Sequence, residues 1–272
     1  MTTPTTSWSE QEFSSRDFEL ILANTFIERV DYCKELDSTN SRAARLAAES
    51  PIDDSRVLVL TDCQTAGRGR GSNRWWSDRG SLTFSVLFRP GSFLLPASLW
   101  PQMSLTTGLA VCNAIESLCG ELKPRIKWPN DVYLHGRKIC GILVEAAEGQ
   151  QGNLIVGVGI NVLNSASQAP ADLRDKVIAL SDATSAKQSR VNVLLAILHH
   201  LGTRLERLTS NSETLRTEWS QRCLLTGRPI EIEIHTNRIA GICLGIDDEG
   251  ALLVKTNSEV KRCLSGVVTK ID

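Results

Sequence analysis

The chain has 272 residues, 42% of them hydrophobic and 22% charged, which is the composition of an ordinary soluble globular protein. Its formal net charge of −1 excludes the bulk basic excess that indicates a nucleic-acid-binding protein. The length fits one large domain, or a main domain with a small additional one.

The eight cysteines and four histidines form no pattern that predicts a metal site or a disulfide framework. No Cys-x-x-Cys pair occurs, and most cysteines lie inside apolar runs, so we expect reduced and largely buried thiols. The first residues lack the basic and apolar segments of a secretory signal, and no apolar run is long enough to span a membrane. We therefore expect a cytoplasmic protein.

The N-terminal part of the sequence predicts a polar leader followed by helix, strand and helix. Residues 1–10 predict the leader, and apolar residues between 13 and 27 predict one or two helices. A short strand is expected to begin at Tyr32. The Asp-Ser-Thr-Asn run at residues 37–40 predicts a helix start, with Asp37 or Ser38 as the cap and the end at Ser50-Pro51. Capping alone explains this run, although its side chains are also well placed to bind a polar ligand group.

Residues 64–76, which we call the glycine loop, combine a permissive backbone with positive charge. Glycine alternates with arginine at residues 67–71, so a ligand can approach the main chain closely and meet forked cationic side chains. The spacing is neither that of a Walker A loop nor that of a dinucleotide fold. Gly-Arg runs also occur in disordered nucleic-acid-binding tails, but strands predicted at residues 57–60 and 82–88 flank this one. We therefore expect an ordered anion site, closed by Trp75 and Trp76.

The following segments predict buried strands, long helices and a small β domain. One helix is expected over residues 98–119, with Ser98 as its cap and Pro101 in its first turn. A buried strand is expected at residues 154–162, where small side chains indicate that something packs closely against it. Four or five short strands from about residue 227 predict a small β-barrel. Further helices are expected near residues 173–180, 191–208 and 213–223.

A second polar stretch precedes the strand at 154–162. Pro129-Asn130-Asp131 and His135-Gly136 predict tight turns, and Lys138 stands at the start of an apolar strand. A lysine that enters a buried strand needs a partner, and no acidic residue is close to it in the sequence. A bound anion is one candidate for that partner, and a solvated lysine on a sheet edge is the alternative.

In their order and spacing, these motifs resemble the biotin protein ligases, which include biotin–acetyl-CoA-carboxylase ligases and holocarboxylase synthetases. The resemblance covers about residues 30–272. It implies an α+β fold, with a catalytic domain like that of class II aminoacyl-tRNA synthetases and then a small SH3-like β-barrel. The catalytic domain, a mixed sheet backed by helices, is expected at residues 1–224, including a leader and helices at 1–30, and the β domain at 225–272. The matching segments are residues 37–40, 67–71 with Trp75, 127–131, Lys138 with 141–143, and 157–161.

The resemblance implies an ATP-dependent ligase that forms biotinyl-5′-AMP and transfers biotin to a lysine of a biotin carboxyl carrier protein. By match, the residues around biotin are Ser38, Thr39, Asn40, Gln64, Gly67, Arg68, Gly69, Arg70, Lys138 and Gly141. Those around ATP or the adenylate are Arg68, Arg70, Trp75, Lys127, Asn130 and Asn161. Trp75 is expected to stack on the adenine and Asn161 to form a hydrogen bond with it.

The chemistry assigns catalytic roles to four of these side chains. The first step brings the biotin carboxylate to the triphosphate, so Arg68, Arg70 and Lys138 are expected to offset repulsion and stabilise the transferring phosphorus. Asp131 is the candidate that orients or deprotonates the target lysine. Mg²⁺ is expected on the triphosphate, held partly by its oxygens and water, without a dedicated protein site.

Two departures from the family pattern matter. Many bacterial members have Gly-Arg where this chain has Ser72-Asn73, so one phosphate-binding arginine is absent unless Arg74 replaces it. The roughly thirty residues before the match are too few for a winged-helix DNA-binding domain, so no repressor role and no nucleic-acid partner are expected. The sequence leaves open whether the protein is a homodimer.

Three alternatives remain from the sequence. A lipoate or octanoate–protein ligase would share the fold, but its Arg-Arg-x-Ser-Gly-Gly-Gly signature is absent. A non-catalytic biotin sensor is disfavoured because Arg68, Lys138 and Asn161 are all present. A nucleic-acid adaptor that uses the glycine loop is disfavoured by the near-neutral charge.

Overall fold

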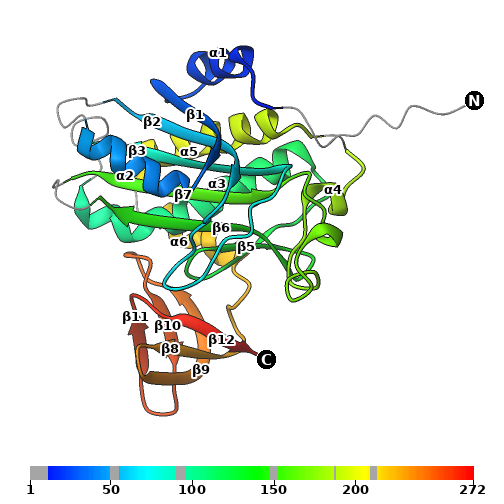
Figure 1. The fold of residues 1–272 in the computed structure, drawn as a ribbon. Coiled ribbons are helices and arrows are strands. Elements are labelled where there is room, and N and C mark those ends of the chain that lie inside the picture. The colour runs from blue at the N-terminus through cyan, green and yellow to red at the C-terminus, as the bar shows by residue number, and fades with distance from the viewer. Residues whose placement is uncertain (1–11, 50–54, 90–95, 148–151, 187, 209–212) are drawn as a thin grey trace, which may run out of the picture.

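The computed structural model describes residues 12–49, 55–89, 96–147, 152–186, 188–208 and 213–272. A main body of helices and one large sheet is followed by a small β domain at the C-terminal end (Figure 1). No helix in these described residues is long and apolar enough to cross a membrane. The predicted leader and the predicted helix end at Ser50-Pro51 lie outside the described residues.

The main sheet has seven strands in the order β1-β2-β3-β7-β6-β5-β4. It is mixed, as expected, because β1 pairs with β2 in parallel and every other neighbouring pair is antiparallel. Tight turns join the antiparallel strands β4, β5 and β6, and His135 and Gly136 supply the positive φ angles (49° and 75°) of the second turn. The strands are β1 (Arg29–Leu36), β2 (Val57–Gln64), β3 (Ser81–Phe88), β4 (Arg125–Lys127), β5 (Asp131–Leu134), β6 (Arg137–Ala146) and β7 (Leu154–Asn161).

Strand β3 lies inside the sheet between β2 and β7 and is buried along its whole length. Its side chains alternate between the two faces of the sheet as predicted, with Leu82, Phe84 and Val86 in the main core. On the other side of the sheet, Leu87 packs with residues of α2 in a second, smaller core. The sheet is therefore covered on both faces, and the face toward α2 also carries the polar side chains Ser81, Thr83 and Ser85.

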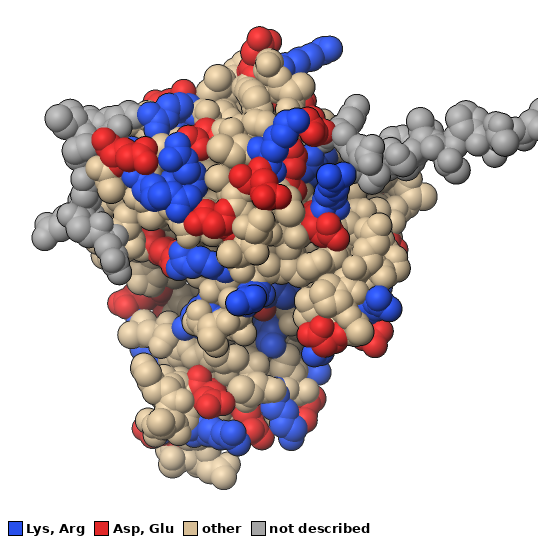
Figure 2. Space-filling model, viewed as in Figure 1, with Lys and Arg blue, Asp and Glu red and all other residues tan. Residues whose placement is uncertain are grey.

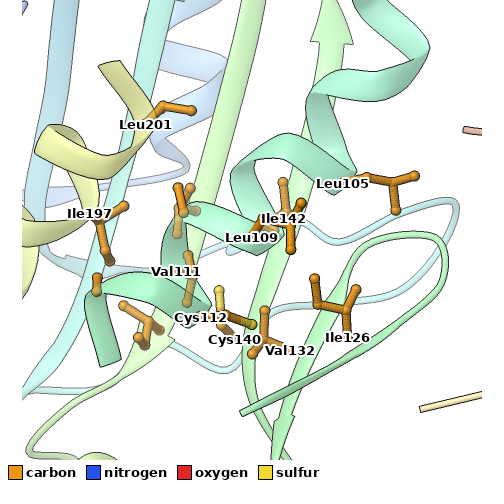
Figure 3. Close-up of a cluster of buried hydrophobic side chains, with 14 of the residues drawn as sticks. Leu105, Leu109, Val111, Cys112, Ile126, Val132, Cys140, Ile142, Ile197 and Leu201 are labelled. Atoms are coloured by element: carbon orange, nitrogen blue, oxygen red, sulfur yellow. The ribbon is translucent and has the colours of Figure 1, made fainter. Parts of the chain in front are cut away.

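Helices α3 and α5 cover the main-core face of the sheet, and α2 lies on the other (Figure 1). Figure 3 shows part of the main core, where side chains of α3 and α5 meet those of β4, β5 and β6. Among them Leu109, Ile142 and Ile197 are at most 2% exposed. The helices are α1 (Ser15–Asn24), α2 (Thr39–Glu49), α3 (Met103–Leu118), α4 (Leu180–Ala183), α5 (Arg190–Leu208) and α6 (Glu213–Arg222), with 3-10 turns η1 (Ala97–Gln102) and η2 (Ala166–Gln168).

Two helix predictions need correction. The helix expected at 98–119 begins as the 3-10 turn η1, which contains Pro101, and becomes α-helical only at Met103. Pro96 precedes the turn and no side chain caps it, so Ser98 is not the cap. The helix expected near 173–180 is absent: turns extend to residue 176, Val177 forms a β-bridge with Lys138, and α4 begins only at Leu180.

The C-terminal domain is a five-stranded antiparallel sheet in the order β11-β10-β9-β8-β12, which agrees with the expected SH3-like domain. The main chain still contacts the main body at Leu224, whose N–H donates to Ile126 O at 2.8 Å. The division at residue 224 stays a prediction. The strands are β8 (Pro229–Ile234), β9 (Asn237–Ile246), β10 (Leu252–Lys255), β11 (Val260–Cys263) and β12 (Val267–Ile271).

All eight cysteines lie in the described residues, and each is a free thiol. Six are buried and two, Cys33 and Cys63, are half-buried, in agreement with the predicted burial. Burial raises the pKa of the Cys112 thiol to about 12, so it stays protonated at neutral pH.

Candidate functional site

A cavity of about 480 Å³ lies between the main body and the C-terminal domain. Figure 2 shows its mouth as a hollow with Lys and Arg side chains around it. The main body lines it with the start of α2, the glycine loop, Thr83 of β3, the β4–β5 turn and the facing strands β6 and β7. The C-terminal domain contributes Glu233, His235 and residues 265–268.

Most of the residues predicted from the sequence meet in this cavity. Two do not line it, Gly67 and Asn161. The predicted residues that do are Ser38, Thr39, Asn40, Gln64, Arg68, Gly69, Arg70, Trp75, Lys127, Asn130, Asp131, Lys138 and Gly141. The ligand contacts of all of them stay predictions.

The start of α2 forms the buried polar end of the cavity. Ser38, Thr39 and Asn40 are each 3% exposed. The Thr39 N–H donates to Gln64 Oε1 at 2.8 Å, which joins the helix start to the end of β2. Asp37, one of the two predicted caps, instead accepts hydrogen bonds from the Arg45 side chain and from the Ser38 N–H.

The amide of Asn40 is engaged entirely by the protein. Its Nδ2 donates to Leu143 O at 3.2 Å and to Glu145 Oε2 at 2.8 Å, and its Oδ1 accepts from Ser85 Oγ at 2.6 Å. A Cβ on Gly157 would lie 2.1 Å from Asn40 Oδ1, so only glycine fits there. Both protons of Nδ2 are used, which leaves Asn40 none to donate to a ligand.

The glycine loop is closed by its own main chain. Gly69 N–H donates to Asn73 O at 2.8 Å, and Trp75 N–H donates to Gly67 O at 3.0 Å. A Cβ on Gly67 would lie 2.5 Å from the carbonyl oxygen of Trp75, so this glycine permits the return of the loop itself. The crossing brings Arg74 opposite Arg68 in a β-bridge, and Arg74 also lines the cavity.

The two predicted loop arginines have different partners. Arg68 forms a short ion pair with Glu145 on β6, and its Nη1 lies 3.4 Å from Ser41 Oγ. Arg70 Nη1 donates to Gly266 O at 2.6 Å, so it bonds the glycine loop to the C-terminal domain. Both remain at the cavity wall, where an entering anion can compete for them.

Lys138 has an acidic partner, which the sequence analysis did not expect. Its ammonium lies 2.6 Å from Asp131 Oδ1. The two residues are seven positions apart, but β5 and β6 pair so that Asp131 stands opposite Gly141 and Tyr133 opposite Lys138. The partner of Lys138 is thus neither a bound anion nor solvent but Asp131, which the hairpin brings to the lysine.

Lys127 adds a half-buried cation at the same end of the cavity. Burial lowers the pKa of its ammonium, while the nearby Asp131 carboxylate raises it. Its Nζ lies 5.8 Å from the centre of the Tyr133 ring, a cation–π arrangement. The β4–β5 turn thus gathers cationic charge where a polyanion would have to bind.

Trp75 lies flat against the small residues of β6 and β7. A Cβ on Gly159 would lie 2.4 Å from its indole, and one on Gly141 would lie 3.3 Å from it. The predicted close approach to β7 is therefore confirmed, but it comes from the protein's own Trp75 and Asn40. Lys138 Nζ lies 5.9 Å from the centre of the Trp75 ring. Stacking of Trp75 on adenine stays a prediction.

Asn161 lies behind the cavity at the end of β7 and is 1% exposed. Its Nδ2 donates to Ile178 O at 3.2 Å, and its Oδ1 accepts from Asn164 Nδ2 at 2.9 Å. In this arrangement it supports the chain after β7. An adenine contact of Asn161, which stays a prediction, would need these bonds to change.

Sequence reasoning missed Glu145, Ser85 and the whole contribution of the C-terminal domain. The signal for Ser85 was available, because the alternation that puts Leu82 and Phe84 in the core puts Thr83 and Ser85 on the opposite face. Glu145 carried a weaker signal, as an acid on a strand with Gly141 and Leu143 on the same face. No group of three or more His, Cys, Asp or Glu side chains that could hold a metal is found among the residues described.

Comparison with known proteins covers both parts of the chain. Residues 32–161 match the Biotin/lipoate A/B protein ligase family, and residues 226–270 match the biotin protein ligase C terminal domain. The chain is 35% identical to the bifunctional ligase/repressor BirA of Bacillus subtilis (strain 168), over 86% of this chain and 71% of that protein. It is 32% identical to the biotin--[acetyl-CoA-carboxylase] ligase of Mycobacterium tuberculosis (strain ATCC 25618 / H37Rv), over 89% and 88%.

A solved structure agrees with these sequence matches. The biotin protein ligase from Aquifex aeolicus in complex with biotin and ATP superposes with a TM-score of 0.76 and 30% identity, over 89% of this chain and 98% of that one. The two family matches, the identities over most of each chain and the superposition show that this chain belongs to the biotin protein ligase family.

Proposed function

We propose that the protein is a biotin–[biotin carboxyl carrier protein] ligase. It uses ATP to convert biotin into biotinyl-5′-AMP and transfers the biotinyl group to a lysine of a carrier protein. The observation that carries the proposal is the cavity itself, which has a buried polar end at Thr39 and Gln64 and a cationic end at Lys127 and Lys138. Those two ends fit a ligand with a polar head group and a carboxylate that must meet a triphosphate.

The first step is attack of the biotin carboxylate on the α-phosphorus of ATP, which expels pyrophosphate. Both reactants are anions, so cations must offset their repulsion and stabilise the charge that develops on the phosphoryl oxygens. Arg68, Arg70 and Lys138 line the cavity and supply that charge. Each is bonded to the protein in this structure, and the ligand exchanges with those partners on binding.

Mg²⁺ is expected to enter on the triphosphate of ATP. The ion prefers oxygen ligands and keeps several waters, so phosphate oxygens supply most of its coordination. Asp131 and Asn130 offer oxygen atoms at the cavity wall that suit such a hydrated ion. The ion would neutralise charge on the β- and γ-phosphates, while Lys138 acts at the reacting carboxylate and α-phosphate.

The second step is attack of a carrier lysine on the mixed anhydride, with AMP as the leaving group. A free lysine has a pKa of about 10.4, so the amine must lose a proton near the site. Asp131 is placed to accept or orient that proton once the phosphate has drawn Lys138 away. The products are an amide on the carrier and free AMP.

The partner we propose is a biotin carboxyl carrier protein or domain of acetyl-CoA carboxylase or a related carboxylase. The cytoplasm is the proposed compartment, and no nucleic acid is expected to take part. A homodimer is compatible with the proposal.

The test is ATP–pyrophosphate exchange with purified protein, measured with biotin, with lipoate and with neither. Exchange that depends on biotin supports the proposal, and labelling of a carrier domain with biotin completes it. Exchange that depends on lipoate and not on biotin would instead assign a lipoate ligase. Biotin binding without exchange would assign a sensor.

A further inference from the structure

The polar face of β3 carries a side chain that neither the core nor the cavity wall accounts for. Ser85 is fully buried and does not line the cavity. Its Oγ lies 2.7 Å from Thr39 Oγ1 and 2.6 Å from Asn40 Oδ1. Ser85 therefore stands directly behind the buried polar end of the cavity. It lies between Thr39 and Asn40, which both line the cavity.

The direction of the hydrogen bonds in this cluster is fixed from one end. Asn40 Nδ2 faces Leu143 O and Glu145 Oε2, which can only accept, so the amide nitrogen must point toward them. Asn40 Oδ1 therefore points to Ser85 and can only accept. The Ser85 hydroxyl is therefore the donor in this cluster, and its proton faces both Asn40 Oδ1 and Thr39 Oγ1.

These bonds decide what Thr39 presents to the cavity. Ser85 Oγ donates to Thr39 Oγ1 at 2.7 Å, so Thr39 is the acceptor in that contact. The Thr39 hydroxyl donates in turn to Gln64 Oε1 at 3.2 Å, and the same oxygen accepts from the Thr39 N–H at 2.8 Å. Thr39 Oγ1 is therefore left with a lone pair and no free proton, and it can only accept a hydrogen bond from a ligand.

Resting on the proposed function, we propose that Ser85 and Glu145 are positioning residues that set selectivity for the ligand's head group. They hold Thr39 as an acceptor for a ring N–H of a cyclic urea. A dithiolane or a plain acyl chain has no N–H to donate, so its binding leaves the buried oxygen without a partner. A site arranged to bond a donor rejects a ligand that lacks it more strongly than an apolar pocket rejects a change of size.

Glu145 has a second role in the same cluster. Its Oε2 accepts from Asn40 and its Oε1 accepts from Arg68 of the glycine loop. The Glu145 carboxylate has one acceptor oxygen for Asn40 and another for Arg68. A glutamine in its place would have only one acceptor oxygen and would turn its N–H groups toward the second donor. Glu145 thus joins the residues that recognise the head group to the loop arginine proposed to meet the ligand's carboxylate.

The test is a double-mutant cycle on biotin affinity, measured by titration calorimetry. Ser85→Ala frees the Thr39 hydroxyl to turn, and biotin binding should weaken about tenfold. In a Thr39→Val background the acceptor is already gone, so adding Ser85→Ala should change the affinity by less than about twofold. Glu145→Gln should also weaken biotin binding and provides a second variant if Ser85→Ala does not fold. Because it also changes the contact with Arg68, part of its effect should remain in the Thr39→Val background.

Glu49→Gln is the matched control, because it makes the same chemical change at the far end of α2, where exposed Glu49 pairs with half-buried Arg42. It should leave biotin affinity unchanged. Wild-type affinity in Ser85→Ala, or effects of Ser85→Ala and Thr39→Val that simply add, would overturn the inference while leaving biotin-dependent exchange in the wild type intact. A wild-type protein that neither binds biotin nor exchanges pyrophosphate would overturn the proposed function, and this inference with it.

Discussion

The ammonium of Lys138 and the carboxylate of Asp131 form an ion pair at 2.6 Å across the β5–β6 hairpin. The two side chains are 30% and 20% exposed, so water screens the pair only in part. In the proposed reaction, incoming phosphate competes with Asp131 for Lys138. If the phosphate binds Lys138 in place of Asp131, the Asp131 carboxylate is free when the carrier lysine arrives. In the proposed reaction the pair would therefore link the two chemical steps.

Lys138→Ala should slow biotin-dependent pyrophosphate exchange by about 10²–10³-fold, because it removes a cation aimed at developing phosphoryl charge. Lys123→Ala is the control, since Lys123 is exposed and its ammonium bonds only Gly120 O in the described contacts. Circular dichroism establishes that both variants fold. Exchange by Lys138→Ala close to that of the control would contradict the role of Lys138.

Asp131→Asn should slow transfer more than activation. With purified biotinyl-AMP and a carrier domain supplied, single-turnover transfer should fall by about 10²-fold, since an amide cannot accept the proton of the lysine amine. Exchange should fall less, because Lys138 remains. An equal loss in both reactions would indicate that Asp131 serves only to position Lys138.

Arg70→Gly should release the adenylate from the cavity. The substitution removes the bond to Gly266 O, which holds the glycine loop to the C-terminal domain, and loosens the cover that shields the mixed anhydride from water. With biotin, ATP and an unrelated protein, the variant should label bystander lysines that the wild type leaves unlabelled, as a biotin blot would detect. Arg79→Gly, in the exposed turn before β3, is the control. If the variant makes adenylate but labels nothing, Arg70 does not retain it.

Gly159→Ala should destabilise the protein by about 1–3 kcal/mol, the usual range for overpacking. The new Cβ would lie 2.4 Å from the Trp75 indole, so the ring must move. Gly120→Ala is matched to it, because its Cβ would meet nothing nearer than 3.9 Å. Urea denaturation measures both. Equal stability of the two variants would show that Trp75 moves at no cost.

Asp37→Asn should change how the free energy of unfolding depends on pH. Hydrogen bonds from Arg45 hold the pKa of Asp37 at about 2, below its ordinary value of 3.8. Between these values the unfolded chain takes up a proton that the native carboxylate does not, so this contribution is full above pH 3.8 and is lost as pH falls toward 2. The variant should lose less stability than the wild type between pH 4 and 2. Parallel losses in urea titrations would refute the assignment.

The sequence predicted the elements whose patterns are local. The alternation at residues 82–88 and the glycine–arginine run needed only neighbours a few positions apart. The start of α3 was misplaced, since a helical pattern does not distinguish a 3-10 turn around Pro101 from an α-helix. Site geometry depended on contacts over long separations, such as Asn40 with Glu145, 105 positions apart. No local pattern contains such a pair.

The position of strand β3 has a consequence for the effect of destabilising substitutions in it. Its side chains alternate between Phe84 in the main core and Ser85 behind the cavity, so one stretch of backbone serves both. A substitution that lets the Phe84 side chain shift by a few tenths of an ångström would also move the Ser85 hydroxyl. Temperature-sensitive variants with a substitution in this strand should therefore lose selectivity for biotin. They should accept other carboxylic acids at temperatures at which the protein is still folded.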